Sequence, residues 1–447
     1  MKNEVMDKSY NYRHEYAPKE LVEKLHNRIG IKPYNPSVKY LRQALVSKYR
    51  ENKNLRLALE LCMGCGACLT VCPAYISTHD IRNSPLGRLL LAKSIIKGHI
   101  NDCIIDYAYT YYWQCLTCRR CAWACPLGID VGDISRTIRS ILYEMSLAPN
   151  YVSKVVDNLE STGNFLGLSP DILRIIIENV INEIRNEKGV DVKVKIDEPA
   201  YALLLPSACA DYTVSIGTFK GYILLLNQLG IDFTISTKAP DITNYGLFID
   251  ERHMRLIAER IIDEAKKLHV KLVIAGECGH GWRVFKNYVI PRLRKYGIDG
   301  THILYITANA IKKGLISIDK SRNGDANYVY MDPCHYVRGG DLINEPRYIL
   351  SKVVHNYTFL NEQPGLAICC GGTSGLLAKE MEELSIKYAK LWYEKAASKS
   401  ANYIVVPCAA CKLQMDRVLP KLNKIYNKEI NFTGLMDLVY KALITKT

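Results

Sequence analysis

The chain has 447 residues, 16 of them cysteine, with a hydrophobic content of 48% and a formal charge of +14. This size and hydrophobicity predict two or three folded domains and exclude a disordered chain. No apolar run approaches the roughly 18 to 20 residues of a membrane-spanning helix, and the charged N-terminus lacks the apolar core of a signal peptide. We therefore expect a cytoplasmic protein, at most peripheral to a membrane, whose reduced cysteines bind metal.

Three segments precede the predicted sheets. Residues 1–60 are basic, are predicted to be helical and carry no functional motif. Residues 61–130 contain eight cysteines in motifs and one isolated thiol, Cys103. Residues 131–197 have the periodicity of a helical connector. In this connector Ser169 and Pro170 predict the start of a helix and Gly189 predicts its end.

The C-terminal 250 residues are predicted to be α/β, with short apolar strands alternating with helices. The predicted strands lie in 201–207, 270–276, 301–307, 327–333 and 402–408, with a further apolar strand before Cys369. We divide this region into a first lobe, 198–320, and a second lobe, 321–447.

Similar segments recur in the same order in the two lobes, which indicates an internal duplication. "YALLLPSACADY" is similar to "NYVYMDPCHYVRG", and "VKLVIAGECGHGW" is similar to "NYIVVPCAACKLQ". In this comparison Asp250 and Glu251 of the first lobe occupy the places of Cys369 and Cys370. The first lobe therefore has a degenerate copy of a motif that the second lobe keeps complete.

Two cysteine motifs of the pattern C-x2-C-x2-C-x3-C-P are the strongest signal in the chain. Such triplets wrap three corners of a 4Fe-4S cube, and the fourth cysteine ligates the other cluster. The spacing therefore predicts two sets of ligands: Cys62, Cys65, Cys68 and Cys125 for one cluster, and Cys115, Cys118, Cys121 and Cys72 for the second. Zinc is the alternative, but zinc knuckles usually show separated C-x2-C pairs.

The segment between these motifs predicts a helix that begins after Ser84. The insert resembles the all-helical ferredoxin domains of respiratory iron–sulfur subunits, which implies a module that conducts electrons without selecting a substrate. Since thiolate-bound clusters are anionic and the Lys and Arg residues are scattered, we interpret the positive charge as compensation for clusters plus an acidic partner, and we expect no nucleic acid.

Five further cysteines are expected to converge at the carboxyl ends of parallel strands, where α/β sheets place their sites. Adjacent cysteines reach one object only if the chain turns, and Gly371 and Gly372 permit a turn. A fifth ligand exceeds what a cube needs and suggests a cluster of another shape. The alternatives are a vicinal disulfide or buried thiols, and a zinc half-site or redox dithiol. The five residues are Cys334, Cys369, Cys370, Cys408 and Cys411.

These residues resemble the CCG motif of heterodisulfide reductase catalytic subunits. The domain order, a helical ferredoxin followed by two α/β lobes, is similar to the D-type catalytic chain of these enzymes. With one complete motif it resembles most closely the K subunit of the dissimilatory sulfite-reduction membrane complex. The resemblance implies a noncubane 4Fe-4S cluster held by the five cysteines, at which a sulfur–sulfur bond is cleaved.

Several residues near these motifs are weaker candidates. Cys278 and His280, with Cys209, could face the cluster from the first lobe as a ligand, a proton donor or a sulfur acceptor, or could be buried remnants. A second set could bind an anionic substrate or deliver protons, or be structural: Arg283, His335 and Arg338.

Together these features predict the catalytic subunit of a membrane-attached complex at the inner face of the membrane. A membrane cytochrome or quinol-oxidising subunit would supply electrons, and a disulfide or trisulfide, or a small sulfur-carrier protein, would receive them. The absence of a flavin or nicotinamide fingerprint makes a separate donor necessary. The alternatives are an iron–sulfur subunit of a flavin-linked 2-hydroxyacid or glycerol-3-phosphate dehydrogenase, and a noncatalytic scaffold or redox sensor.

Overall fold

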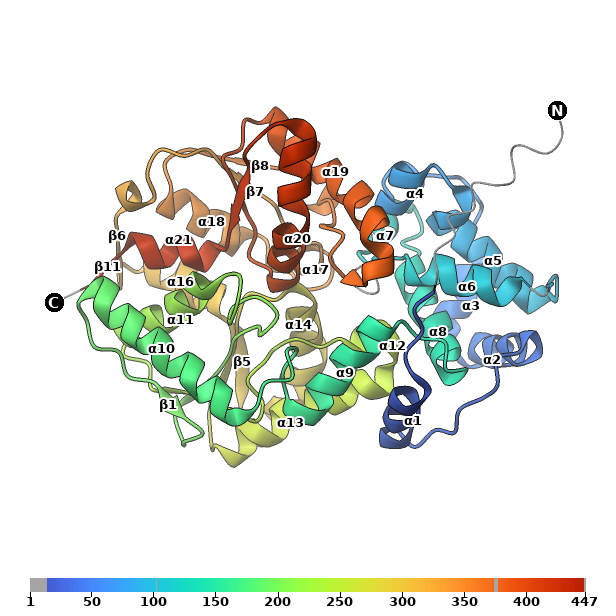
Figure 1. Ribbon diagram of the computed structural model, residues 1–447, viewed down its shortest axis with the longest axis horizontal. Coiled ribbons are helices and arrows are strands. Elements are labelled where there is room, and N and C mark those ends of the chain that lie inside the picture. The colour runs from blue at the N-terminus through green and yellow to red at the C-terminus, as the bar shows by residue number, and fades with distance from the viewer. Residues whose placement is uncertain (1–13, 102, 374–376, 446–447) are drawn as a thin grey trace.

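The computed structural model describes residues 14–101, 103–373 and 377–445. Figure 1 shows a helical N-terminal part beside two α/β lobes, with α19 and α20 of the second lobe between the helical part and the sheets.

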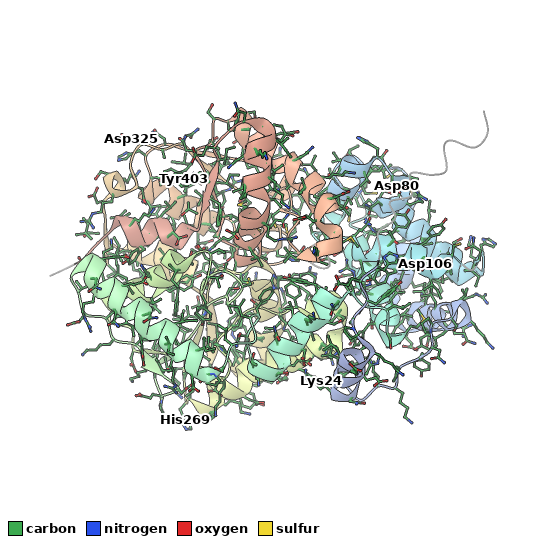
Figure 2. All side chains as sticks on the ribbon, in the orientation of Figure 1. Lys24, Asp80, Asp106, His269, Asp325 and Tyr403 are labelled. Carbon is green, nitrogen blue, oxygen red and sulfur yellow. The ribbon has the colours of Figure 1, made fainter. Side chains whose placement is uncertain are left out.

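Three helices form the basic N-terminal segment: α1 (Lys19–Arg28), α2 (Val38–Glu51) and α3 (Lys53–Leu61). The connector helix α9 (Asn150–Thr162) binds α1 through ion pairs. Lys24, labelled in Figure 2, donates to Asp157 over 3.0 Å. Arg28 lies 2.9 Å from the nearly buried Glu160. Part of the positive charge of this segment is thus neutralised within the chain.

The cysteine-rich region is helical, as expected. Its helices are α4 (Pro73–Thr78), α5 (Pro85–Lys97), α6 (Ile104–Trp113), α7 (Arg120–Ala124) and α8 (Val131–Glu144). Helix α5 begins where the sequence predicts, because the Ser84 side chain accepts a hydrogen bond from the Gly87 amide. The connector ends with α10 (Pro170–Lys188), whose predicted Ser169 and Gly189 caps are confirmed.

The first lobe contains a five-stranded parallel sheet in the order β1-β3-β2-β4-β5. Its elements are β1 (Lys195–Ile196), β2 (Ala202–Leu205), α11 (Ile216–Gln228), β3 (Phe233–Ile235), α12 (Gly246–Ile249), α13 (Glu251–Lys267), β4 (Leu272–Ala275), α14 (Gly279–Val284), α15 (Ile290–Leu293), β5 (Asp299–His302) and α16 (Ile303–Lys312). Strands β2 and β4 are almost entirely buried, which explains their unbroken apolar runs.

The second lobe contains a four-stranded parallel sheet in the order β10-β9-β7-β8. Its elements are β7 (Tyr328–Tyr330), α17 (Cys334–Val337), α18 (Asn344–Val353), β8 (Tyr357–Phe359), α19 (Glu382–Ser398), β9 (Tyr403–Val405), α20 (Ala409–Tyr426), β10 (Asn431–Thr433), α21 (Leu435–Ala442) and β11 (Leu443–Ile444). Taken in chain order, its four strands occupy the same sheet positions as β2, β3, β4 and β5 of the first lobe. Strand β11 pairs with β6 (Ser317–Ile318), which lies at the end of the first lobe.

Two predicted strands are wrong. Most of 301–307 belongs to α16, because the His302 ring accepts from the Leu304 amide and starts a helix whose apolar side faces the core. The run before Cys369 is a 3₁₀ turn over Pro364–Leu366, where proline supplies the first residue of the turn. Short apolar runs fit a strand or a buried helix equally well by periodicity alone.

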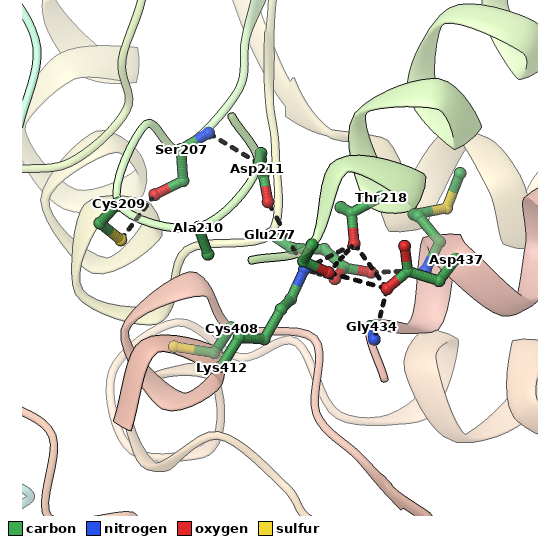
Figure 3. A network of polar contacts seen from close by, with 12 residues as sticks. Ser207, Cys209, Ala210, Asp211, Thr218, Glu277, Cys408, Lys412, Gly434 and Asp437 are labelled. Carbon is green, nitrogen blue, oxygen red and sulfur yellow. Dashed lines mark hydrogen bonds and ion pairs between the residues drawn. The ribbon is translucent and has the colours of Figure 1, made fainter. Parts of the chain in front are cut away.

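A buried ionic network joins the lobes behind the cysteines of α20. Lys412 extends from α20 toward the first lobe and lies 2.9 Å from Glu277 and 3.5 Å from Asp211, with all three side chains excluded from water (Figure 3). The same ammonium donates to Thr218, whose hydroxyl also reaches Asp437 of α21. Helices α11 and α21 pack together beside this network.

Within the described residues, no helix combines the length and the apolarity needed to cross a bilayer.

We predict that Lys412→Met lowers the free energy of unfolding by roughly 3–5 kcal/mol at pH 8, because it leaves buried carboxylates without a counter-charge. Burial already raises the pKa of Glu277 to about 7 and that of Asp211 to about 6. The folded protein therefore binds more protons than the unfolded chain, and this contribution to stability falls as pH rises from about 4 to 7. Removing the Lys412 ammonium makes this loss of stability with rising pH larger.

Urea denaturation at pH 5 and pH 8 measures this effect. Lys424→Met, on the exposed side of the same helix, is the control and should change stability by less than about 0.5 kcal/mol. An equal loss for Lys412→Met at both pH values would contradict the ionic account.

Candidate metal centres

The first cavity is lined by Cys62, Cys65, Cys68 and Cys125 and has a volume of about 40 Å³. Burial raises the pKa of Cys68, and the charges of the other three sulfurs raise it further, so all four lie close together. The remaining lining residues are glycine or apolar. Cys65 is exposed, so this group reaches the protein surface.

The second cavity, of about 20 Å³, is lined by Cys72, Cys115, Cys118 and Cys121. Pro85 and Val131 line both cavities, so one layer of side chains separates them. Each fourth cysteine thus lies with the triplet of the other motif. Arginine side chains also line the second cavity, in contrast to the first.

The five-cysteine site comprises Cys334, Cys369, Cys370, Cys408 and Cys411, and all five are buried. The sulfurs form a contact series in which Cys369 lies 3.8 Å from Cys334 and hydrogen-bonds to Cys370, while Cys411 contacts Cys370 and Cys408. Cys334 follows β7 as the first residue of α17, and Cys408 caps α20 after β9. The adjacent pair follows the 3₁₀ turn, and Gly371 has a φ of 85° that supplies the bend.

Local donors favour thiolates in this site. The hydrogen bond from Cys369 lowers the pKa of Cys370, and the one from Cys411 lowers the pKa of Cys408. The Gly372 amide donates to Cys370 and the Gly279 amide to Cys408, each over 3.3 Å. Two of the five sulfurs therefore have a main-chain donor that holds a negative charge in place.

All three cysteine groups fit iron–sulfur clusters. In the described part of the chain, no three His, Cys, Asp or Glu side chains converge on the position of a single metal ion. The ferredoxin-type cysteines instead surround cavities, and the donors of all three groups are sulfur, the ligand that such clusters require. A larger cavity of about 770 Å³, between α3, α8 and α13, is lined by no cysteine.

The second cavity and the five-cysteine site are in direct contact. Cys118 packs in one buried cluster with Cys369 and Cys334, and it accepts a hydrogen bond from the Cys369 thiol, which lowers the pKa of Cys118 to about 6. Arg338 fastens the two loops, because its guanidinium donates to the carbonyl oxygen of Cys118 over 2.6 Å and to those of Gly365 and Ala367 over 3.0 Å. The sulfurs of the two groups therefore meet directly.

Two first-lobe candidates lie beside the five-cysteine site. Cys278 caps α14, whose first amide binds the Cys408 sulfur, and burial followed by the charge of Cys408 raises the pKa of Cys278. His280 lies 3.7 Å from the Cys278 sulfur, and burial lowers its pKa to about 3, which keeps the ring neutral at physiological pH. Cys209 is farther back, buried and 3.5 Å from the Ser207 hydroxyl.

Asp250 and Glu251, the acidic pair of the first lobe, stabilise the N-terminal end of helix α13. Asp250 caps α13 by accepting from the Arg252 amide over 2.8 Å, and it also pairs with the Arg252 guanidinium. Glu251 pairs with Arg255 at the surface.

The remaining candidates divide by environment. Arg338 is structural, as described, and Arg283 lies 3.9 Å from Asp133. Burial lowers the pKa of His335, and its Nε2 has no hydrogen-bond partner among the described residues. Cys103 is exposed and belongs to none of the three groups.

Sequence reasoning missed Lys412 and Glu277, and only their positions next to Cys411 and Cys278 could have drawn attention to them.

Comparisons with known proteins agree with this arrangement. Residues 58–129 match the family described as a 4Fe-4S dicluster domain, and residues 328–416 match the CCG cysteine-rich domain. An Hdr-like menaquinol oxidoreductase iron-sulfur subunit 2 of Archaeoglobus fulgidus is 29% identical to this chain, over 90% of this chain and 82% of the relative's length.

Two further relatives align along most of their length. The D chain of the dihydromethanophenazine:CoB–CoM heterodisulfide reductase of Methanosarcina barkeri is 23% identical over 88% of this chain and 97% of its own. A probable glycolate oxidase iron-sulfur subunit of Bacillus subtilis is 36% identical over 86% of this chain and 94% of its own. The chain therefore belongs to the CCG-domain family of heterodisulfide-reductase-like iron–sulfur oxidoreductases.

Proposed function

We propose that this protein passes electrons through two cubane 4Fe-4S clusters to a noncubane 4Fe-4S cluster, where a disulfide or trisulfide is reduced. The observation that carries the proposal is the packing of Cys118 with Cys334 and Cys369 in one buried cluster, which joins the dicluster region to the five-cysteine site without an intervening layer. The exposed Cys65 marks the end at which electrons enter.

The proposed ligands follow from the three cysteine groups. Cys62, Cys65, Cys68 and Cys125 would hold the first cluster, Cys72, Cys115, Cys118 and Cys121 the second, and the five-cysteine site the noncubane cluster. Bound there, the last cluster supplies single-electron storage and an iron that accepts a substrate sulfur.

The chain's own groups prepare this site for sulfur chemistry. Burial of all five cysteines excludes water, and the Gly279 and Gly372 amides hold two sulfurs in place. Cys278 retains its proton because burial raises its pKa, so its thiol can hydrogen-bond a substrate sulfur. The neutral His280 ring lies beside this thiol and orients it. Cleaving one disulfide consumes two electrons and two protons and yields two thiols.

The duplication of the α/β lobe favours an accessory role for the first copy. The two sheets share one strand order, and Cys209 and Cys278 follow β2 and β4 as Cys334 and Cys408 follow β7 and β9. With Asp250 and Glu251 in place of the adjacent cysteines, the first lobe contributes side chains to the neighbouring site in place of a second cluster.

We infer further that the protein works in a complex at the inner face of a membrane. Names of the relatives include a menaquinol oxidoreductase and a dihydromethanophenazine-dependent enzyme, which supports a quinol-oxidising or cytochrome-bearing membrane partner. The acceptor would be a small disulfide or a sulfur-carrier protein.

A second candidate function is electron transfer for a flavin-linked 2-hydroxyacid dehydrogenase. The probable glycolate oxidase iron-sulfur subunit, at 36% identity, favours it. Isolation of the native complex separates the two functions: a heme-bearing membrane subunit supports sulfur reduction, and a flavoprotein dehydrogenase supports the second candidate.

We predict that anaerobically purified protein oxidises two equivalents of reduced viologen for each mixed disulfide that it cleaves. Spectrophotometry of the viologen and thiol titration of the products measure the ratio. Viologen oxidation without new thiols would contradict disulfide reduction while leaving electron transfer intact.

Cys369→Ser is expected to remove about a third of the bound iron and all disulfide turnover, because the five-cysteine site loses a central ligand. Iron analysis and EPR of the reduced protein measure this, and both cubane signals should persist. Cys103→Ser, at an exposed thiol outside the three groups, is the control. Full iron content in Cys369→Ser would exclude this residue as a ligand.

Cys278→Ser is expected to retain the iron of all three clusters and to lose disulfide turnover at least tenfold, because a hydroxyl replaces the thiol that faces Cys408. Turnover and iron content are measured together. Cys209→Ser, buried in the same lobe but farther from the site, should remain close to wild type. Unchanged turnover in Cys278→Ser would remove Cys278 from the mechanism.

A further inference from the structure

Four arginines line the second cavity or bond to the backbone of its cysteines, and none of them pairs with a carboxylate among the described residues. Arg88, Arg139 and Arg338 are almost fully buried, with at most 5% of their surface exposed, and Arg120 is half-buried. Buried guanidiniums of this kind are rare unless an opposite charge lies nearby, because removing a charge from water is costly.

The hydrogen bonds of these arginines converge on the segments that carry the second group of cysteines. Arg139 donates to the Cys115 carbonyl, and Arg338 donates to that of Cys118 over 2.6 Å. Arg120 donates over 2.9 Å to Val71, the residue before Cys72. Arg88 lines the cavity itself and donates to Tyr111 over 2.6 Å and to Asn83.

These bonds end on neutral oxygens, so they position the charges without cancelling them. The Nε of Arg120 and one terminal nitrogen of Arg338 have no partner among the described residues. A fifth arginine, Arg119, is different, because Asp130 neutralises it over 2.7 Å. The remaining four positive charges are matched by the sulfurs of the second group and by whatever those sulfurs bind.

The first cavity lacks this feature. Its lining consists of cysteine, glycine and apolar residues, with no charged side chain. The two groups have the same number and type of ligands, and they differ in the charge that the protein places around them.

We propose that Arg88, Arg120, Arg139 and Arg338 raise the reduction potential of the second cubane cluster above that of the first. The proposal rests on the cluster assignment made above. Adding an electron makes a cluster more negative by one charge, and fixed positive charges in a medium of low dielectric constant favour that form. Exposure of Cys65 to water acts in the opposite sense, by favouring reduction of the first cluster, and four buried charges outweigh it.

The consequence is directional electron transfer. One electron leaves the first cluster, which is oxidised, and enters the second, which is reduced, and the equilibrium favours the second. A singly reduced dicluster region therefore keeps its electron beside Cys369, in contact with the five-cysteine site.

The test is a redox titration of the whole protein, followed by EPR, with signals assigned through Cys65→Ser for the first cluster and Cys121→Ser for the second. In wild-type protein the second cluster should be reduced at the higher potential. Arg120→Gln should lower the reduction equilibrium constant of the second cluster at least tenfold, or 59 mV for one electron, and leave the first cluster unchanged.

Arg120→Lys separates charge from structure, because it keeps the charge and should retain the wild-type reduction potential of the second cluster. If Arg120→Gln does not fold, Arg88→Gln repeats the test at the cavity wall. The proposal would be overturned if the two clusters of the wild-type protein had equal or reversed reduction potentials. It would also be overturned if a charge-neutralising variant shifted the potentials of both clusters equally, or shifted neither. Iron analysis keeps the two hypotheses apart, because missing clusters contradict the proposed function, and complete clusters with the wrong order contradict only this inference.

Discussion

A buried guanidinium, that of Arg338, ties together two cysteine-bearing loops of this protein. Arg338 follows the first cysteine of the five-cysteine site by four positions, and it donates to Cys118 in the dicluster region and to Gly365 and Ala367 before the adjacent cysteines. Arginine suits this position because its planar group directs several donors at once, whereas lysine offers a single compact ammonium. Under the proposed function the two groups must remain in contact, so electron transfer would depend on this buried fork.

The two lobes have the same strand order, but they serve different purposes. In the second lobe the turn after β8 delivers two cysteines to the site, while the corresponding residues of the first lobe cap and pair with α13. The first lobe still contributes, because Cys278 and the Gly279 amide lie against Cys408, and Glu277 anchors Lys412 one position after Cys411. The buried ionic network therefore fixes the lobe interface at the place where a thiol from one lobe meets cysteines from the other.

Local signals in the sequence predicted the local structure well. Ser84, Ser169 and Gly189 marked helix ends correctly, because caps depend on nearest neighbours. The strand predicted at 301–307 was wrong, because a short apolar run does not distinguish a strand from a buried helix. Arg338 and Lys412 could not have been assigned, since their partners lie about 200 residues away in the chain and appear only once the lobes fold together.

The three cysteine groups also form a gradient from water to the interior. The first is exposed at Cys65, the second has two buried and two partly buried cysteines beside guanidiniums, and the third is fully buried. Desolvation alone would make each successive cluster harder to reduce, because burial disfavours added negative charge. An inward path therefore requires a compensating positive charge at its middle step. On the proposal above, the unpaired arginines would supply this charge, which would account for the burial of cations beside the second cavity.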